Sequence, residues 1–164
     1  MFWPNLPVRS RAVTSRTSGN PGEASVLGAL VKRGFDVLVP LGDGHPYDLV
    51  VHVARGTFLR VQCKTAWSRG ACLVFRCHMT DHGRGPLPYG GLADIFGVYF
   101  PPRDSVYLVP VDAIAESEGR FRLEPARNNQ RRRIRLAADF ELARWSPDAL
   151  CKVANRAMPV SEAA

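Results

Sequence analysis

A predicted β-hairpin brings together residue types that can bind a metal ion and a phosphate. Residues 46–53 and 57–65 are rich in β-forming side chains and flank a short turn that contains glycine, a pattern typical of a hairpin. If the two strands pair across this turn, Asp48 near the start of the first lies beside Gln62 and Lys64 near the end of the second. An acid, an amide and an amine would then meet at one end of the hairpin.

The second strand of this hairpin alternates between two faces, because successive side chains of a strand point to opposite sides. Its apolar face carries Leu59, Val61 and Cys63. Its polar face carries Arg60, Gln62 and Lys64. An unpaired amide inside a core costs roughly 2–7 kcal/mol, so the polar face requires partners. Two interpretations are open: Lys64 and Asp48 form an internal ion pair, or the polar residues form a functional site.

A site for a divalent cation and a phosphate accounts for these residue types. Asp48 offers a carboxylate oxygen, and the side-chain carbonyl of Gln62 and the backbone carbonyl of Cys63 add neutral oxygens, which are ligands that Mg²⁺ accepts. Mn²⁺ can substitute for Mg²⁺ at such a site. Lys64 would hold or activate the attacking water and offset the phosphate charge. We therefore predict Asp48, Gln62 and Lys64 as catalytic residues, and Asp48, Gln62 and Cys63 as metal ligands.

The composition fits a protein with a polyanionic partner. The 164 residues include 22 Lys and Arg against 15 acids, which gives a formal charge of +7 and a pI near 9.7. Such a balance favours nucleic acid as the partner. The sequence has no long apolar run and no apolar signal segment at its start, so we expect a soluble, cytoplasmic protein without a membrane partner. Its four cysteines should then remain reduced.

The chain reads as a single α/β domain with a central mixed sheet of four or five core strands and a helix packed on it. We expect a flexible basic arm over residues 1–18, the folded domain over 19–145 and a fraying C-terminal tail over 146–164. Further strands are predicted at 35–40, 71–77, 95–100, 106–110 and 121–123. Short helices are predicted at 111–116 and 137–144, and a flexible loop at 81–91.

The first helix should begin near residues 18–21, where cap residues and a proline occur, and end at Gly34. At 100° per residue, its apolar face consists of Val26, Leu27, Leu30 and Val31. Glu23 falls within this face, where a carboxylate without a partner is costly. Glu23 is therefore either a half-exposed residue near the helix N-terminus or a residue that faces the Asp48 site.

Two segments have the composition of nucleic-acid contacts. Arg84 lies in the glycine-rich loop, and the densest basic run of the chain lies between residues 126 and 135. Amides and guanidinium groups of this kind suit phosphate and base-edge contacts. The predicted DNA-binding residues are Arg84, Arg127, Asn128, Asn129, Gln130, Arg131, Arg132 and Arg133. Alternatively, both segments are solvated surface loops.

The ordered set Glu23, Pro46-Tyr47-Asp48 and Gln62-Cys63-Lys64-Thr65 resembles the PD-(D/E)XK nuclease superfamily. The resemblance is closest to a subgroup with a Gln-x-Lys motif that includes intron-encoded homing endonucleases, and more distant to archaeal-type Holliday junction resolvases. It implies a restriction-endonuclease-like core, Mg²⁺-dependent hydrolysis of DNA, and a Glu23 that orders the metal or its water. Gln62 stands where glutamate is usual, which removes one negative charge from the site.

Several functional hypotheses follow. The first is a metal-dependent DNA endonuclease that acts on double-stranded DNA. Because cleavage of both strands usually takes two sites, we expect a homodimer or homotetramer. The alternatives are a junction-resolving nuclease, a catalytically inactive DNA-binding module on the same fold, and a basic scaffold that binds RNA.

Overall fold

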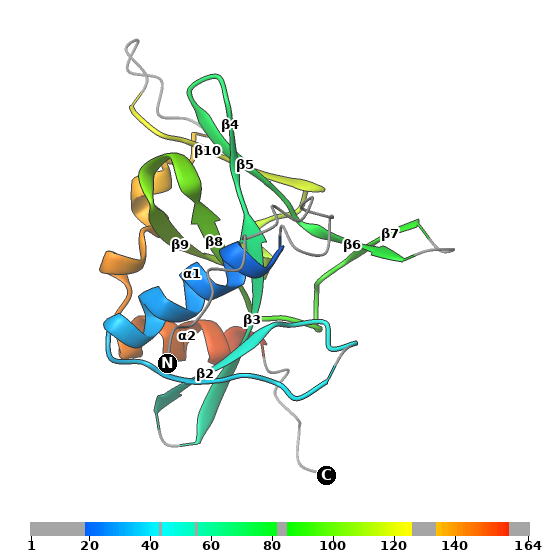
Figure 1. Cartoon of the computed structure of the whole chain (residues 1–164), viewed down its shortest axis with the longest axis vertical. Coiled ribbons are helices and arrows are strands. Elements are labelled where there is room, and N and C mark those ends of the chain that lie inside the picture. The colour runs from blue at the N-terminus through cyan, green and yellow to red at the C-terminus, as the bar shows by residue number, and fades with distance from the viewer. Residues whose placement is uncertain (1–18, 43, 55, 82–84, 126–133, 158–164) are drawn as a thin grey trace, which may run out of the picture.

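The structure is a computed structural model, and it describes residues 19–42, 44–54, 56–81, 85–125 and 134–157. The predicted basic arm (1–18), Arg84 and residues 126–133 of the basic run lie outside the described residues. A five-stranded sheet in the order β1-β2-β3-β8-β9 forms the centre of the fold (Figure 1). Its strands are β1 (Asp36–Leu38), β2 (Leu49–Ala54), β3 (Thr57–Thr65), β8 (Ile95–Phe100) and β9 (Ser105–Pro110).

The predicted hairpin is confirmed as β2 and β3, which pair antiparallel. On its other edge β3 pairs with β8 in parallel, with Gln62 opposite Phe96 and Lys64 opposite Val98. All the other neighbouring pairs of this sheet are antiparallel, so the sheet is mixed, as the sequence predicted. Strand β3 is central: β2 pairs with its first half, up to Val61, and β8 pairs with its second half, from Val61 onward.

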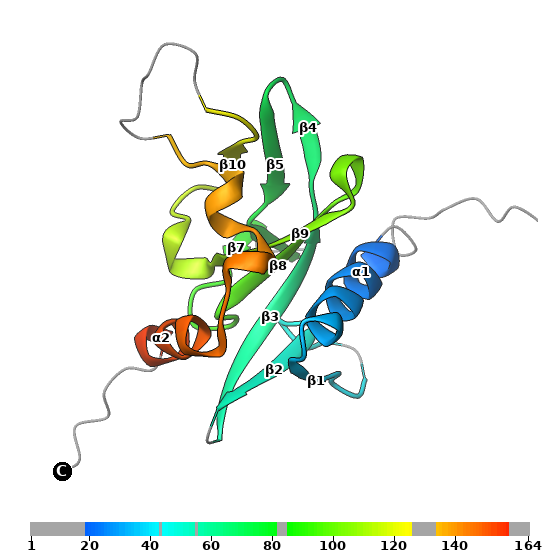
Figure 2. The same ribbon diagram turned by 90° about the vertical axis from the view of Figure 1, so that its left-hand side faces the viewer.

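A second, three-stranded sheet extends from the end of β3 (Figure 2). It has the order β10-β5-β4 and consists of β4 (Trp67–Arg69), β5 (Cys72–Arg76) and β10 (Glu118–Arg122). Part of the segment expected to be a flexible loop forms a hairpin instead, with β6 (His78–Asp81) paired to β7 (Gly85–Pro88).

Both α-helices (Figure 2) contribute buried residues to one core cluster, together with Leu59 and Val61 on the apolar face of β3. The predicted first helix is α1 (Gly19–Lys32), and Gly34 follows it with a φ of 81°, the left-handed conformation typical of a residue just after a helix. Helix α2 (Pro147–Ala157) occupies most of the segment expected to fray. That expectation is wrong for 147–157, because the helix buries Leu150, Val153 and Ala154 in the core.

The remaining helical segments are short 3₁₀ turns: η1 (Pro101–Arg103), η2 (Val111–Ala113), η3 (Ala137–Phe140) and η4 (Leu142–Arg144). They replace the short helices predicted over 111–116 and 137–144. Within the described residues, none of the helices is long and apolar enough to cross a membrane.

Helix α1 packs on β3 and β8 at an unusually short distance. A Cβ atom added to Gly22 would lie 2.2 Å from Oγ1 of Thr65, and one added to Gly97 would lie 2.6 Å from Cγ1 of Val26. The apolar face of α1 is narrower than predicted: Val26 and Leu30 are fully buried, whereas Val31 is 55% exposed. This close packing positions the first turns of α1, and with them Glu23, against the end of β3.

The Gly97→Ala substitution should test this close approach. The added methyl group meets Val26 and also Val61, 3.0 Å away, so we expect a loss of about 1–3 kcal/mol in the free energy of unfolding, as for an overpacked core. Gly28→Ala, within α1 itself, has no atom within 4 Å of its added Cβ. It should stabilise the protein by about 0.5–1 kcal/mol through helix propensity.

Urea unfolding of the two variants measures both free energies. Effects of the same sign for Gly97→Ala and Gly28→Ala would contradict the packing described here.

Candidate active site

The site forms where β2 separates from β3. The antiparallel ladder ends at the pair Leu49–Val61, and one further backbone hydrogen bond runs from Asp48 N–H to the Val61 carbonyl at 2.9 Å. Beyond this point the Asp48 side chain takes the place of the departing strand. Its Oδ2 accepts a hydrogen bond from the backbone N–H of Cys63 at 2.7 Å. The carboxylate is thus fixed to the edge of β3 by the strand's own backbone.

The Gln62 amide lies between two oxygen atoms of this site. Its Nε2 donates to Asp48 Oδ2 at 2.5 Å and to the backbone carbonyl of Cys63 at 3.2 Å. Gln62 is 9% exposed, so these two contacts satisfy a buried amide. The predicted convergence of Asp48 and Gln62 is therefore present in the structure, with the amide nitrogen facing the carboxylate.

Glu23 reaches the same site from α1. Burial raises the pKa of the Glu23 carboxyl, and the negative charge of Asp48 raises it further. The same two charges, after burial as the larger cause, raise the pKa of the Cys63 thiol. The thiol therefore stays protonated, and the atom that Cys63 offers to the site is its backbone carbonyl oxygen. Glu23 is half-exposed near the start of α1 and close enough to feel the charge of Asp48, so both interpretations of this residue stay open.

Lys64 does not form the ion pair that was one interpretation of the sequence. Within the part of the chain that the structure describes, no salt bridge joins Lys64 to Asp48. Its Nζ instead donates to the hydroxyl of Tyr89 at 2.8 Å and lies 4.5 Å from the centroid of the same ring. Tyr89 is 5% exposed, and this contact holds the amine next to the carboxylate without neutralising either.

The loop that carries Tyr89 is fastened to β3 by Arg60. The Arg60 backbone N–H and its guanidinium Nε and Nη2 all donate to the Asp94 carboxylate, at 2.7, 3.0 and 2.7 Å. Arg60 Nη1 also donates to the Gly91 carbonyl at 2.8 Å. Asp94 is thus a structural residue, and its carboxylate satisfies Arg60, the first residue of the polar face of β3.

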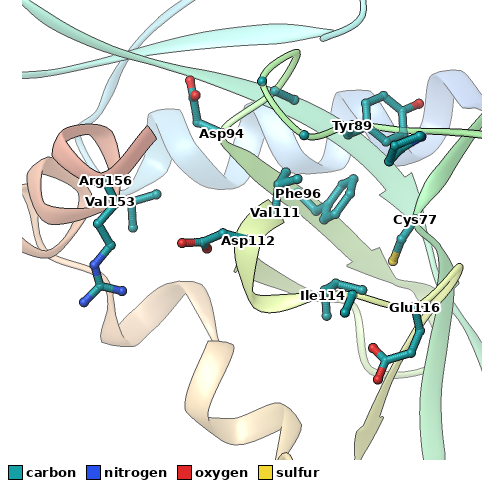
Figure 3. Close-up of a pocket in the computed structure, with 15 residues that line it drawn as sticks. Cys77, Tyr89, Asp94, Phe96, Val111, Asp112, Ile114, Glu116, Val153 and Arg156 are labelled. Carbon is teal, nitrogen blue, oxygen red and sulfur yellow. The ribbon is translucent and has the colours of Figure 1, made fainter. Parts of the chain in front are cut away.

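A cavity of about 390 Å³ lies on the other side of Tyr89 (Figure 3). Tyr89 and Phe96 pack edge to face at its wall, with their centroids 5.5 Å apart. Asp48, Gln62 and Lys64 do not line this cavity. The candidate site is therefore a separate feature, and the tyrosine ring divides it from the cavity.

Burial disfavours the charged forms of the ionisable groups in the site. Burial raises the pKa of Asp48, although the Cys63 N–H, the Lys64 charge and the Gln62 amide act in the opposite direction. Burial likewise lowers the pKa of Lys64, against the charge of Asp48. Burial and the charge of Asp48 raise the pKa of Tyr89 to about 12, so its hydroxyl remains neutral. Such a concentration of shifted groups is typical of functional sites.

The oxygen atoms of the site fit a hard divalent cation. Asp48 Oδ2 and the Cys63 carbonyl both approach the polar hydrogens of one amide, so they flank a point that favours positive charge. Rotation of the Gln62 amide about its last bond would present its oxygen instead, and the two atoms are assigned from their hydrogen bonds. The described residues contain no cluster of three His, Cys, Asp or Glu side chains, so such a cation would depend on the amide and the backbone carbonyl.

Sequence reasoning missed two functional neighbours, Tyr89 and Arg60. Tyr89 lies in a glycine-rich segment, where the sequence suggested either a residue that stacks on a base or part of a flexible loop, and not a partner of Lys64. The arginine at the first polar position of β3, followed by the acid that enters β8, was the one available signal for the Arg60–Asp94 pair. The predicted DNA-binding residues Arg84, Arg127, Asn128, Asn129, Gln130, Arg131, Arg132 and Arg133 lie outside the described residues.

A mixed five-stranded sheet packed against two helices, with an acid, an amide and a lysine where two of its strands part, defines a restriction-endonuclease-like fold. The family model described as PD-(D/E)XK endonuclease matches residues 13–143. This chain belongs to the PD-(D/E)XK endonuclease family.

One solved structure of the same fold is that of a bacterial homing endonuclease, I-Ssp6803I. It matches with a TM-score of 0.62 and 24% sequence identity over 87% of this chain and 96% of that chain. No curated protein matches the chain significantly.

Asp48→Asn should make the protein more stable while removing the charge from the site. Because the folded-state pKa of Asp48 is raised, its carboxyl stabilises the fold fully only below its unfolded pKa, and this contribution is lost as the pH rises through the folded pKa. Asparagine keeps an oxygen for the Cys63 N–H without the buried charge. We expect a melting temperature about 2–4 °C higher at pH 7, which corresponds to roughly 1 kcal/mol.

Thermal unfolding between pH 4 and pH 8 measures this difference, which should shrink as the pH falls. Asp112→Asn at an exposed acid is the matched control. If Asp48→Asn were less stable than the wild type at pH 7, the charged Asp48 carboxylate would not destabilise the fold, which would contradict this prediction.

Proposed function

We propose that this protein is a metal-dependent DNA endonuclease that hydrolyses phosphodiester bonds. The observation that supports the proposal is the meeting of Glu23, Asp48, Gln62 and Lys64 at the point where β2 leaves β3, in a setting that disfavours their charged forms. A bound cation would reduce the repulsion between the carboxylates of Glu23 and Asp48. The buried amine of Lys64 is suited to bind a phosphate.

In this proposal the oxygens of Asp48, the Cys63 carbonyl and the Gln62 amide hold Mg²⁺, and Glu23 orders the metal or its water. Mn²⁺ can take the same position. When bound, the cation polarises the phosphate and lowers the pKa of a bound water. The protein's share is to fix these oxygens in place before substrate arrives, which the backbone contact between Cys63 and Asp48 achieves.

Lys64 acts on the water and the phosphate. Because its pKa is lowered, a larger fraction of the amine is neutral near pH 7 than for an exposed lysine, and neutral Nζ can accept a proton from the attacking water. The water oxygen then bonds to phosphorus as one P–O ester bond breaks. As an ammonium, Nζ donates to phosphate oxygens and offsets their charge. Tyr89 is a positioning residue that keeps Nζ directed at the site.

Two alternatives use the same fold. A junction-resolving nuclease would cut a four-way junction in preference to a linear duplex. A catalytically inactive DNA-binding module would bind duplex without cutting it in any metal, and substitution of Asp48 or Lys64 would leave its function unchanged. The desolvated Lys64 favours an enzyme over this module, because DNA binding alone does not need a buried amine.

We also propose that the active form is a homodimer or homotetramer, because cleavage of both strands of a duplex requires two sites. Sedimentation of the protein with and without duplex DNA measures the assembly. A monomer that cuts both strands at the same position would contradict this part of the proposal.

The central experiment is the cleavage of plasmid DNA and of a four-way junction in Mg²⁺, Mn²⁺ or EDTA. We expect wild-type protein to cut only with a metal, and Lys64→Ala to lose about 10²–10⁴-fold in rate, as for the loss of a general base. Lys152→Ala, an exposed lysine of α2, is the matched control and should cut at the wild-type rate. Duplex binding without metal-dependent cutting would favour the inactive module.

Tyr89→Phe tests the positioning of Lys64 separately. The phenyl ring remains, but Nζ loses a partner that favours its charged form, so the pKa of Lys64 should fall further. We expect kcat to fall about tenfold, equivalent to roughly 1.4 kcal/mol, and the limb of the pH–rate profile that belongs to Lys64 to move to lower pH. Tyr99→Phe removes a hydroxyl that donates to Asp104 and not one that contacts Lys64, so it should leave the profile unchanged. A fall in kcat without a shifted profile would indicate a purely structural Tyr89.

A further inference from the structure

The three-stranded sheet β4-β5-β10 has one face that carries a set of arginine side chains. Across the antiparallel ladders, Arg76 is opposite Glu118, and Cys72 has Arg122 on one side and Arg69 on the other. Directly paired residues of a sheet project from the same face. The arginine face is therefore defined by Arg69, Arg76, Arg120 and Arg122, together with Trp67.

The opposite face of the same sheet is buried, which fixes the orientation of the arginines. Leu73, Phe75 and Phe121 are each at most 1% exposed and belong to the core below the sheet. Phe75 and Phe121 stack with their centroids 6.0 Å apart. Because side chains alternate along each strand, the arginines must project away from this core, and Arg69, Arg76 and Arg120 are exposed.

The arginine face has a strong excess of positive charge. The three strands contain four arginines and a single acid, Glu118. Arg69 forms a two-bond pair with Glu118, at 2.8 and 3.2 Å. The pKa of Glu118 is lowered first by its hydrogen bonds to Arg69, with further contributions from the charges of Arg120 and Arg76, so these guanidinium groups surround one carboxylate. Arg76 and Arg120 exceed what this acid can balance.

This face is continuous with the candidate active site. Strand β3 ends at Thr65 and β4 begins at Trp67, so Trp67 is three residues, or about 10 Å of strand, beyond Lys64. Figure 2 shows β4 and β5 extending from the end of β3. On the far edge, Arg122 N–H donates to the carbonyl of Arg135. A single DNA duplex is long enough to cover both features.

We propose that the arginine face binds the sugar–phosphate backbone of duplex DNA on one side of the cleaved position. The inference rests on the proposed function, since it names how the substrate of that site is held. Guanidinium groups pair with phosphate oxygens through two parallel hydrogen bonds. One strand of a duplex presents a phosphate for every 3.4 Å of helix axis, so several phosphates are within reach of a sheet whose strands are about 4.8 Å apart. Trp67 adds an aromatic surface beside them.

The test is the salt dependence of duplex binding in EDTA, where cleavage does not interfere. The probe is a fluorescent 30-base-pair duplex of mixed sequence, and the variant is Arg76→Ala with Arg120→Ala. Each lost phosphate contact should lower the slope of log K against log [salt] by about 0.9, so we expect a slope reduced by nearly two and an affinity at least tenfold weaker. Arg156→Ala in α2, on the far side of the molecule, is the control and should change neither.

The outcomes separate this inference from the proposed function. If the double variant keeps the wild-type slope of log K against log [salt], the arginine face does not bind DNA, even if the wild-type protein cuts DNA. An equal loss of affinity and slope with Arg156→Ala leads to the same conclusion. Tighter binding of an RNA duplex than of DNA overturns the inference as well. A reduced slope in a protein that fails to cut DNA in any metal supports the arginine face and contradicts the nuclease. Thermal unfolding of the double variant checks that these exposed substitutions leave the fold intact.

Discussion

The separation of β2 from β3 is the constraint on which the rest of the site depends. A strand that loses its neighbour leaves backbone N–H and C=O groups without partners, and buried groups of this kind must be satisfied. Here the Cys63 N–H is satisfied by the Asp48 carboxylate and the Cys63 carbonyl by the Gln62 amide. The need to complete the sheet edge thus places an acid and an amide at one point. The same oxygens are those that a hard cation would use.

The fold keeps the ionisable groups of the site in place although their burial disfavours the charged forms. Asp48, Glu23 and Lys64 are all shifted away from their charged forms by burial. Polar groups placed in this way are costly, and proteins retain them mainly where function requires them. Close packing of α1 at Gly22 and Gly97 keeps the helix in contact with the sheet, so that the site cannot relax by moving the helix outward.

The two sheets have different roles in this structure. The central sheet, with both faces covered, supplies a rigid frame and the polar residues at the end of β3. The smaller sheet β4-β5-β10 has one face in the core, and its other face carries exposed arginines around the buried Val74. Because β3 runs almost directly into β4, the frame that fixes the reactive groups also fixes the charged surface relative to them.

The sequence by itself determined the hairpin, the alternation of β3 and the set of Asp48, Gln62 and Lys64. These are short-range signals: a period of two residues along one strand and a turn between two strands specify which side chains share a face. It also indicated the family, through the order of the three motif elements, and the mixed sheet. The narrower apolar face of α1 and the ordered α2 were beyond it, because helix burial depends on what the helix packs against.

Only the tertiary structure decided the partners of the polar face. Lys64 bonds to Tyr89, 25 residues away in the sequence, and Arg60 bonds to Asp94, 34 residues away. Neither pairing has a local pattern, since each depends on the parallel addition of β8 to β3 and on the loop before it. The arginine face arises in the same way, from the register of β5 with β10. Spacing along a chain fixes the face of a strand, whereas the identity of its neighbour is a property of the folded sheet.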